Sequence, residues 1–240
     1  MVLDPDTLER LVPDEVHPED VAGLESLDFH LERYRFAAER LPPGRVLDIA
    51  CGVGYGTYVL GQREGVSSVL GVDLSSTAVD YAKARYGGDG VEFCVSDAML
   101  FRDQDGFDGI VSLETVEHVP EPERFFEHLV RMLRPDGVLV VSVPVTPSVD
   151  LNPHHLHDFT RASFRALGDA HGLCELASHL QVQRVKLREL TRGRRFRRAN
   201  LRPNLVAYYR SHPAAFARRV VTTLRCGLAN HYLTLAWRRS

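Results

Sequence analysis

Short apolar runs alternate with amphipathic stretches along most of this 240-residue chain. The apolar runs are rich in valine and leucine, and their shortness favours buried strands over buried helices. Strands are expected from Val46 up to the glycines that follow it, and at Val69–Val72, Val91–Val95, Gly109–Leu113 and Val138–Val143. Helices are expected near Gly56–Gly61 and at Thr77–Tyr86 and Glu121–Leu133. This alternation predicts a parallel sheet with helices on both faces.

The two ends of the chain depart from this rhythm. Residues 1–28 are acidic and interrupted by prolines, which predicts an extended arm or a pair of short helices. A helical spacing begins at Phe29 and closes at Pro42-Pro43-Gly44, so residues 29–43 are expected to form and end a helix. Towards the C-terminus, a helix at Arg161–Ala170 precedes two strands, Cys174–Val185 and Leu228–Arg238, which are expected to pair antiparallel.

Length and composition indicate one soluble α/β domain over residues 1–240. The N-terminus lacks a basic segment followed by a long apolar stretch, and the run Val138–Val143 is too short to span a bilayer. We therefore expect a cytoplasmic protein without a membrane span. The cysteines are too scattered for a structural zinc site or a disulfide framework. They are Cys51, Cys94, Cys174 and Cys226. The preference for arginine over lysine suggests a GC-rich bacterial genome.

A glycine-rich turn is expected directly after the first strand. Gly52, Gly54 and Gly56 allow positive φ angles, or let a ligand approach backbone N–H groups without meeting a Cβ. The next strand ends in Asp73, about 20 residues downstream, where a βαβ unit places a carboxylate beside a ribose. The third strand ends near Asp97, which is suited to receive an exocyclic amine of adenine or, alternatively, to serve as a turn aspartate.

Acids and histidines follow the fourth and fifth strands. Glu114, Glu117 and His118 have the spacing i, i+3, i+4, which would place them on one face of a turn before Pro120. Buried carboxylates and imidazoles need partners, so packing explains such a group poorly. The alternative is that Glu114 and His118 cap the next helix and that the histidines of the second loop, such as His155, line a surface.

The chain resembles the class I S-adenosylmethionine (SAM)-dependent methyltransferases through five motifs in order. They are Asp48-Ile-Ala-Cys-Gly-Val-Gly-Tyr-Gly56, Gly71-Val-Asp-Leu-Ser75, Ser96-Asp-Ala98, Phe107-Asp-Gly-Ile-Val-Ser112 and Leu133-Arg-Pro-Asp-Gly-Val-Leu-Val-Val-Ser-Val143, in which Asp136 replaces the more usual glycine. The resemblance implies a Rossmann-like, doubly wound, mostly parallel seven-stranded sheet with a C-terminal antiparallel hairpin. It also implies SAM as cofactor, held by Asp48, Ala50, Gly52, Gly54, Asp73, Leu74, Asp97, Ala98 and Leu113.

In this family the helix over residues 29–43 covers the cofactor, which places His30, Arg33 and Tyr34 near the methionine end, although packing explains Tyr34 equally well. The pair Glu-x-x-Glu-His and Asn-Pro-x-His-x-x-x-Phe-Thr also resembles a subset that includes ubiquinone-pathway, glycan or glycolipid, and small-RNA 2′-O-methyltransferases. The resemblance implies a divalent cation, Mg²⁺ or Mn²⁺, bound by Glu114, Glu117, His118 and His155. Three of these, Glu117, His118 and His155, are the expected catalytic residues.

Arginines are concentrated between the two C-terminal strands. Residues 186–227 are expected to form a basic helical insertion, and Arg184–Arg202 is its most basic part. A charge run of this kind is usually a solvated face. The alternatives are an anionic acceptor such as a nucleotide-sugar or phospholipid headgroup, RNA, or the acidic N-terminal arm of a second protomer in a homodimer.

The sequence thus predicts a SAM-dependent O-methyltransferase, assisted by a metal, that acts on a hydroxyl of a sugar, glycolipid or secondary metabolite. One alternative is a metal-independent methyltransferase that uses His118 or His155 as a general base on a phenol or amine. Another is an RNA 2′-O-methyltransferase or a non-catalytic SAM- or RNA-binding module. The acidic pocket edge disfavours nucleic acid, because it would repel phosphates. A nicotinamide-dependent oxidoreductase would need a third glycine where Thr57 stands.

Overall fold

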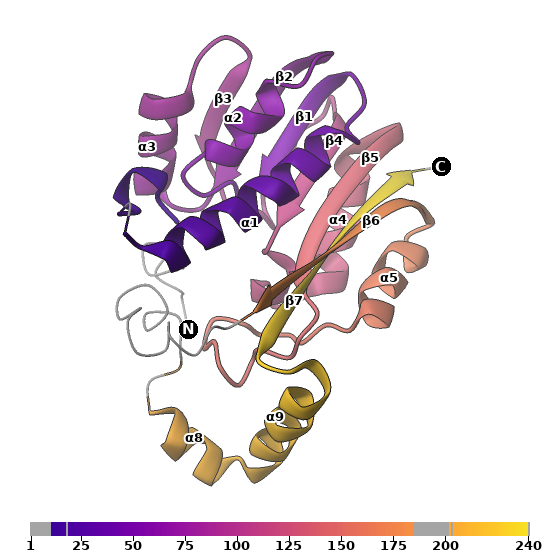
Figure 1. Ribbon diagram of the computed structural model, residues 1–240. Coiled ribbons are helices and arrows are strands. Elements are labelled where there is room, and N and C mark those ends of the chain that lie inside the picture. The colour runs from indigo at the N-terminus through magenta and orange to yellow at the C-terminus, as the bar shows by residue number, and fades with distance from the viewer. Residues whose placement is uncertain (1–10, 18, 185–201, 203, 240) are drawn as a thin grey trace.

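A seven-stranded sheet with the order β3-β2-β1-β4-β5-β7-β6 forms the centre of the molecule (Figure 1). The computed structural model describes residues 11–17, 19–184, 202 and 204–239. Strands β1 to β5 run parallel, whereas β7 is antiparallel to both β5 and β6. The strands are Gly44–Ile49 (β1), Val66–Asp73 (β2), Val91–Val95 (β3), Phe107–Leu113 (β4), Leu133–Pro144 (β5), Leu173–Arg184 (β6) and Ala229–Arg239 (β7). The predicted Rossmann-like sheet with its antiparallel C-terminal hairpin is confirmed.

Every helix that the hydrophobic pattern predicted between strands is present. The α-helices are Val21–Ala38 (α1), Tyr55–Gly61 (α2), Ser76–Tyr86 (α3), Pro122–Met132 (α4), Arg161–Ala170 (α5), Leu205–Ser211 (α8) and Pro213–Cys226 (α9), and two 3₁₀ turns are Pro13–Glu15 (η2) and Val116–His118 (η3). The expected start of the first helix at Phe29 is wrong, because α1 begins at Val21, within the segment predicted as an arm. The Asp20 side chain caps it by accepting from the Gly23 N–H at 3.1 Å.

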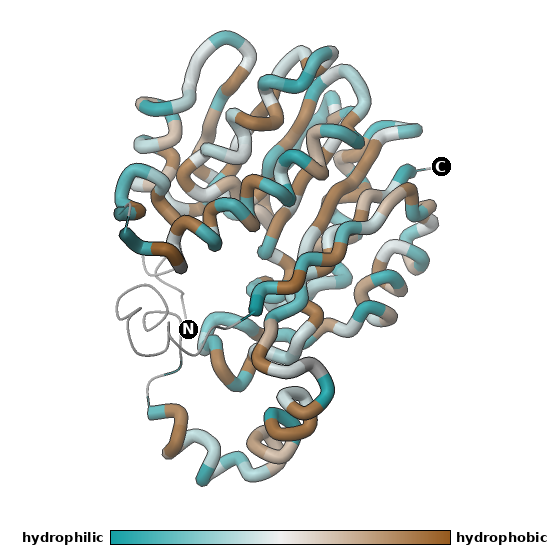
Figure 2. The backbone as a smooth tube through the Cα atoms, viewed as in Figure 1, coloured by the Kyte–Doolittle hydropathy of each residue, from teal (hydrophilic) through white to brown (hydrophobic). Residues whose placement is uncertain are grey.

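Helices cover both faces of the sheet (Figure 1). On one face, Tyr34 of α1 and Leu60 of α2 belong to one buried cluster. On the other, Phe126 of α4 and Phe164 of α5 pack around Trp237 of β7, with Phe126 and Trp237 ring centroids 5.6 Å apart. Each of these three aromatic side chains is fully buried, so each contributes roughly 2 to 3 kcal/mol of hydrophobic stabilisation. Figure 2 shows the same pattern as apolar strands between more polar helices.

The predicted fifth strand is longer than its apolar run. It begins at Leu133 rather than at Val138 and includes an exposed turn. Asp136 in that turn has a φ of +61°, a conformation that favours glycine or a short polar residue. This explains why aspartate is tolerated at the position where the resemblance leads one to expect glycine.

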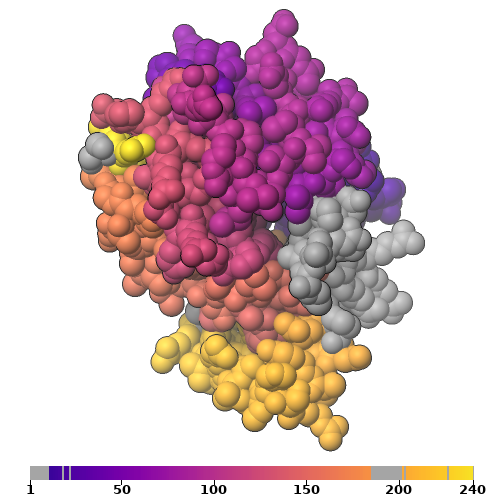
Figure 3. Space-filling model, turned by 180° about the vertical axis from the view of Figure 1, so that it is seen from behind, coloured from indigo at the N-terminus to yellow at the C-terminus, as the bar shows by residue number. Residues whose placement is uncertain are grey.

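Helices α8 and α9 form a hairpin that lies apart from the sheet (Figures 1 and 3). They occupy part of the helical insertion predicted for residues 186–227. The arginines at 188–198, for which several roles were considered, lie outside the described residues. In the part of the chain that the structure describes, no helix is both long enough and apolar enough to cross a membrane.

Candidate functional site

The glycine loop after β1 contains three glycines with different structural roles. Gly52 has a φ of +57°, and a Cβ built there would meet no atom within 4 Å. Gly54 has a φ of +84°, and its Cβ would lie 2.6 Å from that of Ala82. Gly56 is helical, and a Cβ there would overlap the ring of Tyr34. Packing therefore requires Gly54 and Gly56 to lack side chains, whereas Gly52 leaves open space in which a ligand can lie against the backbone.

Asp73 joins the end of β2 to this loop. Its Oδ2 accepts from the Gly52 N–H at 2.8 Å, and its Oδ1 accepts from the Ser75 N–H at 3.0 Å. A carboxylate has about four lone-pair sites, so these bonds orient it and still leave capacity for ribose hydroxyls. The Gly54 N–H donates to the Cys51 carbonyl at 3.2 Å. The expectation that free N–H groups of Gly52 and Gly54 face a ligand is therefore wrong.

The remaining residues predicted to hold adenosine lie at the ends of β2 and β3. Leu74 is 44% exposed, and Ala98 packs against the larger core cluster. Asp97 is partly buried, and its Oδ1 accepts from the Met99 N–H at 2.7 Å. This is the turn geometry of the alternative interpretation of Asp97, and its contact with adenine stays a prediction.

Asp48 lies fully buried on β1 below the glycine loop. Its carboxyl group accepts hydrogen bonds from Thr57 Oγ1 at 2.7 Å and from the Tyr34 hydroxyl at 3.3 Å. Burial raises the pKa of Asp48 to about 7, and these two bonds oppose that rise. Asp48 therefore connects α1 to α2 through their side chains and does not itself line the cavity above the loop.

A cavity of about 590 Å³, its open mouth included, lies between α1 and the ends of β1 and β4. This volume is in the range of small-molecule sites. Three predicted cofactor residues, Ala50, Gly52 and Leu113, line it. The helix residues His30, Arg33 and Tyr34 line it as well, together with Leu11, Cys51, Val53, Tyr55 and Glu114. The structure thus brings α1 and the glycine loop together as the resemblance implied.

The α1 side of this cavity is polar. His30 Nδ1 lies 2.8 Å from the Tyr55 hydroxyl, and burial, followed by the charge of Arg33, lowers the pKa of His30 to about 3. The Arg33 guanidinium is 4.8 Å from the ring centre of Tyr232 and 2.8 Å from Glu114 Oε1. The cavity therefore has a neutral imidazole and a paired, permanently charged guanidinium on one wall.

Glu114 does not join the other predicted metal ligands. Its Oε1 accepts from Ser142 Oγ at 2.6 Å in addition to pairing with Arg33. The sequence placed Glu114 on one face of a turn with Glu117 and His118, but the turn, η3, begins at Val116. Glu114 lies before it with a φ of +51°, which turns its side chain towards α1 and β5.

Glu117, His118 and His155 do come together as predicted. One potential donor atom from each lies within 4.8 Å of the other two. Glu117 is 1% exposed, and its Oε1 is 4.0 Å from His118 Nε2. The His118 and His155 rings are perpendicular, with centroids 4.8 Å apart. A carboxylate and two imidazoles suit divalent cations such as Mn²⁺ or Fe²⁺ and fit Mg²⁺ less closely.

Hydrogen bonds orient the two imidazoles. His118 Nδ1 donates to the His154 carbonyl at 3.0 Å, and His155 Nδ1 lies 2.6 Å from Ser148 Oγ. This leaves the Nε2 atom of His118 with its lone pair, an arrangement common in metal-binding histidines. Burial lowers the pKa of His118, and burial with the neighbouring histidines lowers that of His155 to about 3. Both rings are therefore neutral near pH 7.

Backbone contacts hold the two loops of this cluster together. The Glu117 carbonyl accepts from the Leu156 N–H at 2.8 Å, and His157 Nε2 lies 3.0 Å from the Val119 carbonyl. His154 and His157, which have no counterpart in the resemblance, thus take part in fixing the loop that carries His155.

Sequence reasoning missed two residues that shape this site. Ser142 is fully buried and bonds Glu114, and it is the single polar residue in the run Val138–Val143, a signal that was available. Tyr55 lies between Gly54 and Gly56 of the glycine loop, and its contact with His30 of α1 depends on packing that no local pattern reports.

Comparison with known proteins identifies similar domains. Residues 47–141 match a family model described as a methyltransferase domain. A Mycolicibacterium smegmatis protein named as a probable S-adenosylmethionine-dependent methyltransferase is 29% identical over 70% of this chain and 65% of its own length. A Synechocystis 2-methyl-6-phytyl-1,4-hydroquinone methyltransferase is 36% identical over 43% of this chain and 33% of its own length. The chain thus spans less than two thirds of these relatives.

Solved structures share the fold at low sequence identity. The N-methyltransferase NodS from Bradyrhizobium japonicum, in complex with S-adenosyl-L-homocysteine, superposes with a TM-score of 0.61 at 15% identity and covers 92% of this chain and 89% of its own. The [4+2]-cyclase SpnF superposes with a TM-score of 0.62 at 20% identity, over 90% of this chain and 82% of its own. The fold alone therefore does not choose the reaction.

Proposed function

We propose that this protein is a class I, SAM-dependent methyltransferase that transfers a methyl group from SAM to a hydroxyl, with the help of a divalent cation. The match of residues 47–141 to a methyltransferase domain supports this. The proposed acceptor is a sugar, glycolipid or secondary metabolite. The family match and the relatives support SAM as the methyl donor. The relatives' names include hydroquinone, phosphoethanolamine and aconitate methyltransferases, so the acceptor is argued from the site.

The cavity beside the glycine loop supports the proposed SAM site. Gly52 leaves room at the position of its missing Cβ, and Asp73 is held directly behind it. Asp73 would accept from the ribose hydroxyls, and Arg33 at the α1 wall would attract the carboxylate of the methionine moiety. Glu114, which pairs with Arg33, would orient that guanidinium.

The convergence of Glu117, His118 and His155 carries the metal part of the proposal. A divalent cation bound there would lower the pKa of an acceptor hydroxyl and orient its oxygen. Both imidazoles are already oriented for this role. The His154 carbonyl contacts His118 Nδ1, and Ser148 Oγ contacts His155 Nδ1. The acceptor hydroxyl would release its proton to solvent, its oxygen would attack the methyl carbon, and the carbon–sulfur bond would break to leave S-adenosylhomocysteine.

The same imidazoles support a second candidate, a metal-independent transfer with a histidine as general base. His118 would then accept the proton of a phenol or amine. His155 is a poor base, because burial lowers its pKa to about 3, far from the value that suits catalysis near neutrality. Removal of metal separates this candidate from the first.

The decisive experiment combines chelation with product analysis. Candidate acceptor pools are incubated with labelled SAM before and after exhaustive EDTA treatment, and methylated products are identified by mass spectrometry. We expect EDTA to abolish methylation, and Mn²⁺ to restore it more fully than Mg²⁺. Full activity of metal-free protein would contradict metal assistance and favour the histidine base.

Two variants test whether the metal-dependent activity depends on the proposed ligands. Glu117→Ala and His155→Ala should lower kcat at least about 100-fold and leave SAM affinity within about twofold, because the cation acts on the acceptor. Glu121→Ala is the matched control, since this exposed carboxylate begins the next helix and pairs with Arg124 on the surface. A loss of activity in Glu121→Ala equal to that in Glu117→Ala would remove the argument for the cluster.

A further inference from the structure

Helix α9 carries a row of exposed apolar side chains. Phe216, Val220 and Leu224 recur every four residues and therefore share one face of the helix. They are 52%, 41% and 82% exposed, and Leu228 after the helix is 50% exposed. On α8, Val206 is 76% exposed. We call these five residues the apolar stripe of the α8–α9 hairpin.

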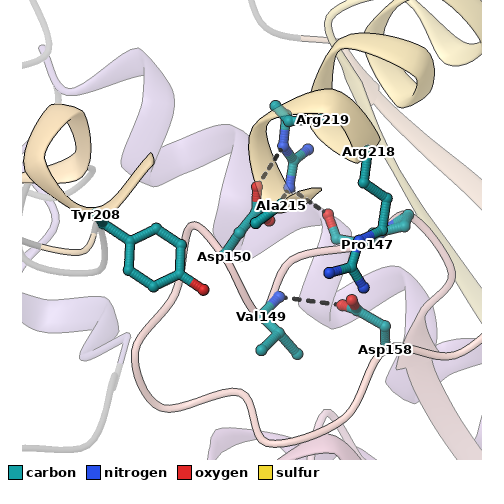
Figure 4. Close-up of a pocket in the computed structure, with 8 residues that line it drawn as sticks. All are labelled: Pro147, Val149, Asp150, Asp158, Tyr208, Ala215, Arg218 and Arg219. Atoms are coloured by element: carbon teal, nitrogen blue, oxygen red, sulfur yellow. Dashed lines mark hydrogen bonds and ion pairs between the residues drawn. The ribbon is translucent and has the colours of Figure 1, made fainter. Parts of the chain in front are cut away.

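The opposite side of α9 is attached to the protein. Ala215 is 6% exposed, and Arg219 donates from Nε to Asp150 Oδ2 at 3.0 Å. Arg219 also donates to the Pro147 carbonyl (Figure 4). Tyr209 of α8 donates to Asp150 Oδ2 at 2.6 Å. Because this attachment fixes the buried side, the apolar stripe is left on the outer side of the helix. Among the described residues, none packs over the apolar stripe closely enough to bury any of its five side chains.

The charge along the sequence is one-sided. From residue 184 to the C-terminus the chain contains fifteen arginine and lysine residues and a single acid, Glu189. The remaining 31 of the 32 acids precede residue 184. The α8–α9 hairpin itself has no acid, and its exposed bases include Arg210 and Arg225. An anionic surface would thus attract the exposed Arg210 and Arg225, because the hairpin carries no acid to offset their charge.

We propose that the α8–α9 hairpin docks on an anionic phospholipid membrane surface through its apolar stripe and arginines. An apolar face beside basic side chains is the pattern of helices that lie in the membrane interface. Two copies of the chain that paired through the same stripe would bring together two hairpins that carry arginines and no acid, which disfavours such a dimer. An anionic lipid surface satisfies both the apolar and the basic side chains.

The docking surface is connected to the histidine loop. Asp150 and Pro147, which hold Arg219, flank Ser148, whose hydroxyl contacts His155 Nδ1 at 2.6 Å. The membrane surface would therefore lie next to the loop that carries His155, and an amphiphilic acceptor could present its headgroup there. Membrane binding itself does not depend on the proposed methyl transfer.

Vesicle co-sedimentation of the full chain tests the proposal. The probes are phosphatidylcholine vesicles with and without added phosphatidylglycerol, at low and high salt. We expect binding to the anionic vesicles only, and weaker binding at high salt because salt screens the attraction. Absence of binding to anionic vesicles at low salt would overturn the proposal.

Three variants assign the binding to the hairpin. The pair Arg210→Gln and Arg225→Gln should weaken binding about 30-fold, from about a factor of five per arginine. The pair Phe216→Ser and Leu224→Ser should weaken it at least about tenfold, because two apolar anchors are lost. Leu100→Ser is the control, since Leu100 is 71% exposed on a loop that is distant in sequence from the hairpin. This variant should bind vesicles like the wild type.

Two outcomes would point to other occupants or other surfaces. If the apolar pair binds vesicles like the wild type while neutralisation of Arg194, Arg195 and Arg197 abolishes binding, the basic segment and not the hairpin is the membrane site. If gel filtration shows a dimer that the apolar pair converts to a monomer, a second copy covers the stripe. Thermal unfolding and S-adenosylhomocysteine binding of each variant verify that it is folded, whether or not methyl transfer occurs.

Discussion

The guanidinium of Arg33 lies 2.8 Å from Glu114 Oε1, and this ion pair joins α1 to the end of β4. The Arg33 side chain is 3% exposed, so its charge has lost nearly all of its hydration. A buried charge is stable only when it is paired, and the pair therefore links the position of the helix that covers the cavity to the edge of the sheet.

Replacement of Glu114 by alanine should lower the free energy of unfolding by about 2 to 3 kcal/mol, because Arg33 would stay buried without its carboxylate. Urea denaturation measures this change. Glu39→Ala is the control, since Glu39 is 72% exposed and pairs with Arg40 on the surface, and it should cost less than about 0.5 kcal/mol. Equal losses in the two variants would contradict a special role of the buried pair.

Asp73→Ala should weaken SAM binding by about 2 kcal/mol, as expected when a charged hydrogen-bond partner is removed. The variant also loses the bonds to the Gly52 and Ser75 N–H groups, which orient the loop. Isothermal titration calorimetry with SAM gives the affinity. Asp80→Ala, at an exposed position on α3, should bind SAM like the wild type. Unchanged affinity in folded Asp73→Ala would exclude the ribose role, and binding of NADH in place of SAM would overturn the assignment of the cofactor.

Alanine at two glycines of the loop should affect SAM affinity to different extents. Gly52→Ala places a methyl group in the open space of the cavity and should weaken SAM binding more than tenfold, while its φ of +57° costs about 1 to 2 kcal/mol of stability. Gly56→Ala forces the Tyr34 ring to move, which should cost about 1 to 3 kcal/mol of stability with a smaller effect on affinity. Calorimetry and urea denaturation on both variants separate the two effects. A larger affinity loss in Gly56→Ala would reverse the assignment.

Acid should destabilise the protein through His30. Its folded pKa is about 3, below the ordinary value of 6.5, so the unfolded chain binds a proton that the folded state does not. The stability contributed by neutral His30 is complete above about pH 6.5 and falls as the pH is lowered towards about 3, by about 1.4 kcal/mol per pH unit. His155 contributes in the same direction, because its pKa is also lowered to about 3.

The difference between variants isolates this contribution. Asp48 acts in the opposite direction, because its folded pKa of about 7 lies above the ordinary 3.8 and its contribution is lost as the pH rises through that range. His30→Gln should therefore reduce the acid slope of the unfolding free energy by about 1.4 kcal/mol per pH unit relative to the wild type. Tyr55→Phe should keep the slope, because burial and not the hydroxyl depresses the pKa of His30. An unchanged slope in His30→Gln would contradict the assignment of this acid sensitivity to His30.

Local patterns in the sequence were sufficient to predict the sheet and part of the site. The strand Val91–Val95 and the helix Arg161–Ala170 have the bounds that their hydrophobic spacing predicted. The location of Asp73 at the site could be predicted from its place at the end of a strand, since parallel strands have their carboxyl ends at one edge of the sheet. Glu117 and His118 are adjacent in one short turn, so their proximity is likewise a local property.

Only the tertiary structure decided which partner each polar side chain meets. Glu114 pairs with Arg33 and not with the histidines, and Gly56 is required by Tyr34. Both partners, Arg33 and Tyr34, belong to α1. Hydrophobic periodicity and motif spacing predict which residues are neighbours along the chain, but they do not predict contacts between elements that are distant in sequence. The sequence by itself therefore determined the Rossmann-like sheet, the glycine loop and the edge at which the site lies. The packing of α1 against the end of β4 pairs Glu114 with Arg33, so Glu114 lies outside the cluster of Glu117, His118 and His155.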